Sequence, residues 1–225
     1  MNRFLSVVAL AGLACAANAQ APTAIYTWQV SDNAGVSWSD TVWVPAGQII
    51  NVRLFASWTG IPDAVGVGYA GGQFDARILC SGVVPISNID RPVPFNFAPQ
   101  TLVASAIAGG MKIDTSADVA GIGLGTGWVN PGQAAHFANP SAFNSTNGAV
   151  VFTYDVLSTS SYAIFDCVLN GTAGRSMAVY SNATGTQIRI DDSVTTVTGA
   201  SIGIPTPTSF ALLGIGGLTV ARRRR

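Results

Sequence analysis

Alternating apolar and polar side chains are the feature that most limits what this chain can fold into. In one stretch every second residue is apolar, and the residues between are polar except for Phe55; the apolar series is Ile50, Val52, Leu54, Ala56 and Trp58. Residues 150–156, 74–80 and, more briefly, 188–190 repeat the pattern. Because side chains alternate across a β-strand, this period of two predicts strands with one buried face.

Composition points the same way. The chain has no Glu and a single Lys, Lys112, although both residues are common on helix surfaces. Clusters of Gly, Pro, Asn and Thr separate the alternating stretches, as at residues 45–47, 59–63 and 181–185. Many short strands between such turns predict an all-β fold, which we expect to be a single antiparallel β-sandwich of jelly-roll type over residues 20–204.

The first 19 residues have the pattern of a secretory signal peptide. Arg3 is followed by an apolar run and then by Ala17-Asn18-Ala19, a small-residue site for signal peptidase. We therefore expect an exported chain that begins at Gln20.

The last 21 residues, 205–225, combine three features. Pro205 and Pro207 flank Thr206, an apolar segment covers residues 210–221, and four arginines follow, Arg222, Arg223, Arg224 and Arg225. Arginines after an apolar segment stay on the cytoplasmic side of the membrane. Because the segment is shorter than a full helical span of ~20 residues, we expect a short transmembrane segment that is held transiently in the inner membrane.

This ending resembles the PEP-CTERM sorting signal of bacteria that use an exosortase, in the variant common in planctomycete-type proteins. Thr206 stands where the usual motif has Glu. The resemblance covers only residues 205–225. It implies processing by an exosortase-like enzyme, a secreted or cell-surface location, and an association with extracellular polysaccharide or matrix.

Two cysteines remain after signal-peptide removal, Cys80 and Cys167, and both fall on expected strands. Because export brings them into an oxidising compartment, we expect a disulfide between them. Two separate buried thiols are the alternative.

Charge and side-chain supply exclude several functions. Five of the eleven basic residues lie in the two terminal segments, so the central region carries six against eleven Asp, which excludes a basic nucleic-acid-binding surface. His136 is the single histidine, and no serine stands in a G-x-S-x-G elbow. One histidine and two cysteines are too few for a typical zinc site. We therefore expect no catalytic residues and no cofactor.

Calcium is the one metal for which the sequence offers candidates. Asp191 and Asp192 are adjacent, and Asp114 and Asp118 form a second acidic pair. Aspartate oxygens suit calcium, although aspartates in turns are more often simply solvated.

Residues 31–38 resemble the Asp-box of sialidase-like β-propellers, with Asn33 in place of Asp and Ser37 in place of Thr. A single copy predicts a tight hairpin rather than a propeller. In it Asn33 bonds the turn backbone, Gly35 takes a positive φ, and Trp38 packs beneath.

Aromatic residues provide two alternatives. Trp58 continues the inward-facing series and belongs to the core. Trp43, Tyr69 and Trp128 are candidates for a platform that stacks on sugar rings, with burial in the core as the alternative.

Three functions follow, in this order. The first is a non-enzymatic surface or extracellular-matrix protein with a structural or interaction role. The alternative is a carbohydrate-binding module for extracellular polysaccharide. The third is a secreted hydrolase that uses two aspartates.

Overall fold

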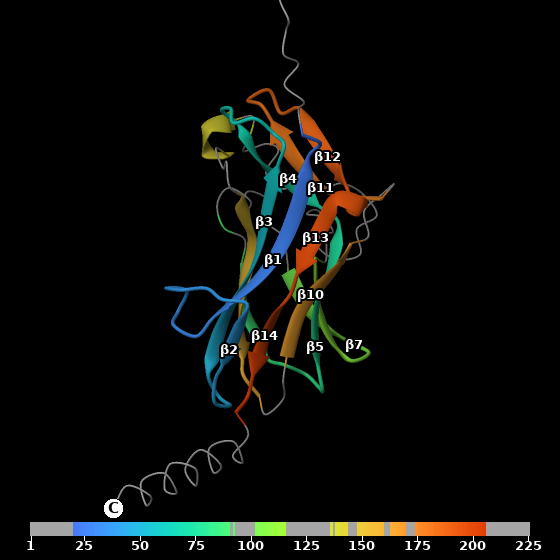
Figure 1. The fold of residues 1–225 in the computed structure, drawn as a ribbon. Helices are drawn as coiled ribbons and strands as arrows, with labels where there is room; N and C mark the ends of the chain where they lie inside the picture. The colour runs from blue at the N-terminus through green and yellow to red at the C-terminus, as the bar shows by residue number, and fades with distance from the viewer. Residues whose placement is uncertain are drawn as a thin grey trace, which may run out of the picture.

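The computed structural model describes residues 20–90, 92, 102–115, 136, 138–143, 148–159, 163–169 and 174–205. Strands dominate these residues (Figure 1). Their bounds are β1 Thr23–Ser31, β2 Thr41–Trp43, β3 Ile49–Thr59, β4 Val67–Gly72, β5 Phe74–Cys80, β6 Ile86–Asp90, β7 Leu102–Ile107, β8 Gly110–Thr115, β9 Ala149–Leu157, β10 Ala163–Leu169, β11 Arg175–Ser181, β12 Gln187–Asp191, β13 Thr195–Thr198 and β14 Ala200–Gly203. Two short 3-10 helices, η1 Pro140–Phe143 and η3 Asp192–Val194, complete the described elements.

The strands form three sheets. Sheet A has the order β13-β1-β3-β9-β6, sheet B the order β2-β14-β10-β5-β8-β7, and sheet C the order β12-β11-β4. Aromatic rings join sheets A and B across the core, since Trp28 and Tyr154 of sheet A each have their ring centroid 6.2 Å from that of Phe165 in sheet B. The all-β sandwich expected from the sequence is thereby confirmed.

Pairing is antiparallel except at two places. β1 pairs with β13 in parallel, and β2 pairs with β14 in parallel. β13 belongs to sheet A and β14 to sheet B, so residues 195–203 cross from one layer to the other, as do β1 and β2 near the start of the described chain. Only Gly199 separates β13 from β14, and a Cβ atom there would lie 2.8 Å from the carbonyl oxygen of Phe165.

The alternation in the sequence matches the buried face of β3. All five residues of its apolar series are buried, from Ile50 to Trp58. β9 departs from the simple pattern, because a bulge shifts its register between Leu54 and Phe55 of β3. The bulge leaves Val151 and Phe152 both buried, although they are consecutive in the chain.

In sheet C, β4 does not follow the alternation. Every residue of β4 is buried, so both of its faces are covered. Gly72 is the last residue of β4. The hydroxyl groups of Tyr26 and Tyr69 occupy the space that a Cβ atom at this position would need. The Tyr26 hydroxyl donates a hydrogen bond to the carbonyl oxygen of Ser176 in β11 at 2.9 Å, which links sheet A to sheet C.

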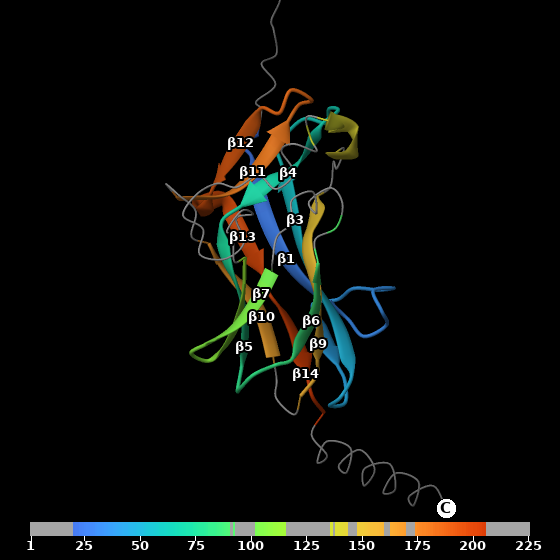
Figure 2. The same cartoon turned by 180° about the vertical axis from the view of Figure 1, so that it is seen from behind.

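The described chain starts and finishes at opposite ends of the sandwich. Near its start, the backbone of Gln20 lies against Gly60, beside the end of β3. At its finish, the carbonyl oxygen of Gly203 accepts a hydrogen bond from Val44 N, next to β2. Figures 1 and 2 show β2 and β14 at the lower end of the molecule, away from β4, β11 and β12.

Candidate functional site

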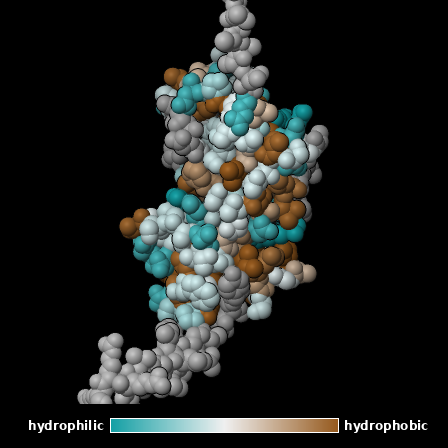
Figure 3. All heavy atoms as spheres, in the orientation of Figure 1, coloured by the Kyte–Doolittle hydropathy of each residue, from teal (hydrophilic) through white to brown (hydrophobic). Residues whose placement is uncertain are grey.

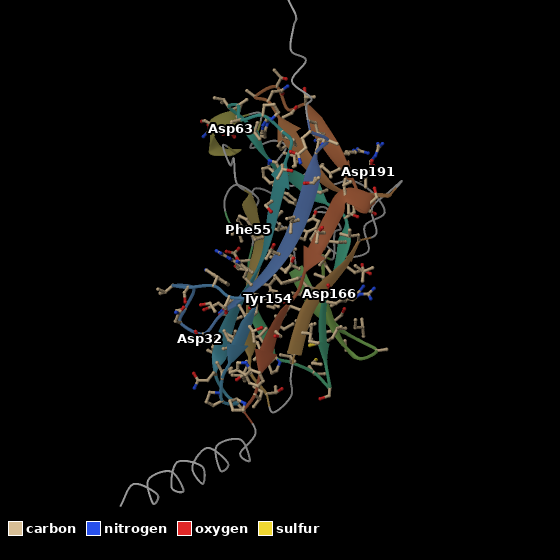
Figure 4. All side chains as sticks on the ribbon, viewed as in Figure 1. Asp32, Phe55, Asp63, Tyr154, Asp166 and Asp191 are labelled. Carbon is tan, nitrogen blue, oxygen red and sulfur yellow. The ribbon has the colours of Figure 1, made fainter. Side chains whose placement is uncertain are left out.

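We first searched the described residues for side chains that could hold a metal ion together. Among the described residues, no three His, Cys, Asp or Glu side chains are grouped so that they could hold a metal ion. Figure 4 shows Asp32, Asp63, Asp166 and Asp191 on separate parts of the molecule. None of these four carboxylates faces another across a site, as a two-aspartate hydrolase would require.

His136 has a structural position. Its ring is buried and stacks on Tyr180 with centroids 3.9 Å apart. Its Nε2 lies 2.8 Å from the carbonyl oxygen of Gly66, next to the start of β4. The His136 side chain thus packs against sheet C.

The calcium candidates lie in three different settings. Asp191 Oδ1 accepts a hydrogen bond from Arg175 Nε at 2.8 Å, and both side chains are about half exposed. Asp192 begins η3, and Asp114 lies in β8 opposite Val103. Asp118 lies outside the described residues. The calcium site stays a prediction.

The expected disulfide between Cys80 and Cys167 is wrong for this structure, in which both cysteines are free. They lie on the neighbouring strands β5 and β10, but Cys80 is opposite Ala163 and Cys167 is opposite Ala76. Four residues of strand correspond to about 13 Å, whereas a disulfide requires Cα atoms within about 7 Å. Burial raises the pKa of both thiols, most strongly that of Cys167.

The expected sugar platform does not assemble as three residues. Tyr69 is only 2% exposed, because β4 is covered on both faces. Its inclusion in the platform is therefore wrong. Trp43 is 65% exposed, and its ring lies against the backbone of Gly203, its partner in the parallel β2–β14 pair. Trp128 lies outside the described residues.

Residues 31–38 form the hairpin that the sequence predicted. Asn33 Oδ1 accepts hydrogen bonds from Ser31 Oγ at 2.8 Å and from Ser37 N at 3.0 Å. Gly35 has φ +80°, and a Cβ atom there would lie 3.3 Å from the ring of Trp38. The hairpin closes where Val30 and Ser39 exchange two backbone hydrogen bonds.

The outer face of sheet A is polar around this hairpin. The Arg53 guanidinium lies 4.2 Å from the ring centroid of Trp38, and Arg53 Nε donates to Gln29 Oε1 at 2.7 Å. Partial burial lowers the pKa of Arg53. Farther along the sheet, Asp155 accepts hydrogen bonds from the side-chain amides of Asn51 and Asn88, at 2.6 and 2.7 Å. These polar side chains on the outer face of sheet A thus bond to one another.

The outer face of sheet B differs, because apolar side chains flank a charged row there. The register places Ile164 opposite Leu79, and Asp166 opposite Arg77 and then Lys112 of the next strand. Ile164, Leu79 and Val168 are all about 40% exposed. In Figure 3, hydrophobic residues gather among hydrophilic ones on the right of the view, the side of β10 and β13. We call Arg77, Leu79, Ile164, Asp166 and Val168 the sheet B face.

The two terminal segments, in which the sequence predicts targeting signals, lie almost entirely outside the described residues. This holds for residues 1–19, for Pro207, for the apolar segment 210–221 and for Arg222, Arg223, Arg224 and Arg225. Pro205 is the last residue described. Within the part of the chain that the structure describes, no helix has the length and hydropathy needed to cross a membrane.

Comparison with known proteins gives structural neighbours only. No family model matches the sequence, and neither does any curated protein. The sixth cohesin of scaffoldin B from Acetivibrio cellulolyticus, solved in complex with a dockerin, is 12% identical with a TM-score of 0.39, over 82% of this chain and 99% of that one. A non-cellulosomal cohesin from the archaeon Archaeoglobus fulgidus is 10% identical with a TM-score of 0.35, over 83% and 92%. Such low scores assign the chain to no family.

Proposed function

We propose that this chain is an exported cell-surface protein that acts without catalysis, as a binding module for a protein partner. The sheet B face is its binding surface. The observation that carries the proposal is the arrangement of this face, in which exposed apolar side chains border a row of charges. Among the described residues, no group of three or more possible metal ligands offers an alternative site.

The chemistry of the sheet B face fits a protein partner. Ile164 and Leu79 form an exposed apolar pair on adjacent strands, and the next row holds Asp166, Arg77 and Lys112. Interfaces between separately folded proteins combine apolar groups with polar or charged ones. The row places one negative charge, Asp166, beside two positive charges, Arg77 and Lys112, and this order would fix the register of a partner with complementary charges.

Export and surface location are proposed from the two terminal segments. Residues 1–19 direct secretion, and the apolar segment 210–221 holds the chain in the inner membrane until an exosortase-like enzyme processes residues 205–225. The opposite positions of the described start and finish suit this role, since an anchor after Pro205 leaves the rest of the sandwich directed away from it.

A second function, polysaccharide binding, is favoured by one observation. Trp43 is a largely exposed aromatic ring held in place against Gly203. A single ring can stack on one sugar, whereas modules that bind chains tightly combine several groups. Tyr69 cannot contribute, because it is buried.

The test compares two isoleucines on opposite faces. Ile164 on the sheet B face and Ile25 on the outer face of sheet A are both 39% exposed. The variants Ile164→Asp and Ile25→Asp therefore add the same charge at matched exposure. Binding of each purified variant is measured on producer cells that lack the protein.

We expect Ile164→Asp to weaken binding by about tenfold or more, because a charge replaces an exposed apolar side chain of the face. Ile25→Asp should bind like the parent protein, and protease treatment of the cells should remove the binding. Equal binding by both variants would contradict the proposal. Binding that survives protease but is lost in Trp43→Ala would instead support polysaccharide as the ligand.

A further inference from the structure

We infer that the end of the sandwich where the described chain finishes rests on the lipid bilayer while the chain is anchored. This end comprises residues 43–49, 81–85, 157–159 and 203–205, and we call it the exit end. The inference rests on the proposed anchoring by residues 210–221. It adds a second membrane contact, made by folded residues.

Backbone hydrogen bonds bring the four segments of the exit end together. Gly47 N donates to the carbonyl oxygen of Ser158 at 2.8 Å, and Leu157 N donates to that of Pro85 at 3.0 Å. Val44 N donates to the carbonyl oxygen of Gly203 at 3.0 Å. These bonds place three turns and the last described strand at one end, which is the lower end in Figure 1.

Large apolar side chains project from this end. Val83 is 68% exposed, Trp43 65%, Ile49 63% and Leu157 40%. Ile49 and Leu157 are opposite each other in the β3–β9 pair, while Trp43 lies across the turn on sheet B. The apolar groups therefore surround the end on both sheets, as is suited to contact with a flat surface and not with a narrow groove.

Charge is absent from the same region. Residues 41–50, 80–89, 156–159 and 193–205 contain no Asp, Glu, Lys or Arg. The central region as a whole carries more aspartates than basic residues. A bilayer with anionic lipids would repel those aspartates at close range, but screening weakens the repulsion beyond about 10 Å. An end without charge can approach the headgroups at the least electrostatic cost.

The anchor brings a membrane within reach of this end. Five residue steps separate Pro205 from Phe210, where the apolar segment begins. Fully extended, five residues span at most about 18 Å. With the arginines cytoplasmic, the sandwich lies on the outer side of the inner membrane with its exit end nearest the lipid.

A bilayer fits the exit end better than a sugar does. Sugar sites place several carboxylates or amides beside the stacked ring to bond the hydroxyl groups, whereas Gln48 is the single side chain of either kind among the exit-end residues. Tryptophan is enriched at the headgroup level of membranes, where its ring is apolar and its N–H is solvated. Aliphatic neighbours such as Val83 and Ile49 enter the same zone.

The test uses the full chain in vesicles of phosphatidylethanolamine and phosphatidylglycerol. Tryptophan fluorescence is compared between ordinary vesicles and vesicles whose acyl chains are brominated, because bromine quenches only rings that lie within the lipid. Three proteins are measured: the parent, Trp43→Tyr, and Trp43→Tyr with Val65→Trp. Val65, in the turn before β4, is 58% exposed and provides the control position away from the exit end. Circular dichroism checks that each variant is folded.

We expect brominated lipid to quench the tryptophan fluorescence of the parent. The part of this quenching that comes from Trp43 should be missing in Trp43→Tyr, and adding Val65→Trp should not restore it. Flotation with the vesicles reports the anchor separately. A chain that floats but shows equal quenching in the parent and in Trp43→Tyr overturns the exit-end contact alone. A chain that does not float overturns the proposed anchor and this inference together. Quenching restored by Val65→Trp would show contact without preference for the exit end and would also overturn it.

Discussion

Cys80 and Cys167 lie on neighbouring strands, yet each thiol is opposite an alanine and not opposite the other cysteine. Their register keeps both sulfurs free although both residues are exported under our proposal. Cys167 is buried in the core, and Cys80 lies at the end of β5, where its Sγ approaches the carbonyl oxygen of Gly82 at 2.9 Å.

We therefore expect two free thiols in protein that begins at Gln20. Without any reductant, alkylation in denaturant should add two adducts, seen by intact mass spectrometry. In the native protein only Cys80 should react, because Cys167 is buried. A mass that gains adducts only after reduction would contradict the register of β5 and β10.

The reaction of Cys80 should depend on pH in a particular direction. Burial raises the pKa of this thiol, so less thiolate is present at a given pH than in the unfolded chain. Native alkylation should therefore approach its maximal rate at higher pH than alkylation in denaturant. The check is the rate of adduct formation across a pH series, with Cys167→Ala as the control in both conditions. Coincident profiles would contradict the raised pKa.

The hairpin of residues 31–38 should depend on the amide of Asn33. Asn33→Ala removes the acceptor for Ser31 Oγ and Ser37 N, and the loss should cost about 1–2 kcal/mol of unfolding free energy. Asn33→Asp keeps the acceptor and should cost much less. Urea denaturation of the three proteins, with and without calcium, measures the effect. A calcium-dependent gain in stability for Asn33→Asp would indicate a metal role that the hairpin geometry does not require.

Gly72 should tolerate no side chain. A Cβ atom there would overlap the Tyr26 hydroxyl and lie 2.5 Å from that of Tyr69, in a part of the core with no room to expand. Gly72→Ala should therefore lower the unfolding free energy by about 1–3 kcal/mol. Adding Tyr26→Phe removes one overlapping oxygen and should recover part of the loss. Strictly additive effects of the two substitutions in denaturation would contradict the contact.

Local patterns were enough to predict several elements of the molecule. The alternation from Ile50 to Trp58 identified a strand and its buried face, because the period of two is a property of the strand itself. The Asn33 hairpin was equally local, since its hydrogen bonds join residues only two or four apart. Both predictions are confirmed.

Other features depended on contacts between distant residues. β4 carries no alternation, because this strand is covered on both faces, and this buried Tyr69 where the sequence suggested an exposed ring. The bulge in β9 and the parallel pairs of β13 and β14 also leave no periodic signal in the sequence.

The sequence by itself determined the all-β class, the buried face of β3, the hairpin and the excess of aspartate over basic residues. Only the tertiary structure decided that Cys80 and Cys167 stay apart, that Tyr69 is buried while Trp43 is exposed, and that Ile164 and Leu79 share one face. The reason is that alternation sets which way a side chain points within its own strand, whereas register and layer order set what it meets, and these depend on pairings between strands far apart in the chain.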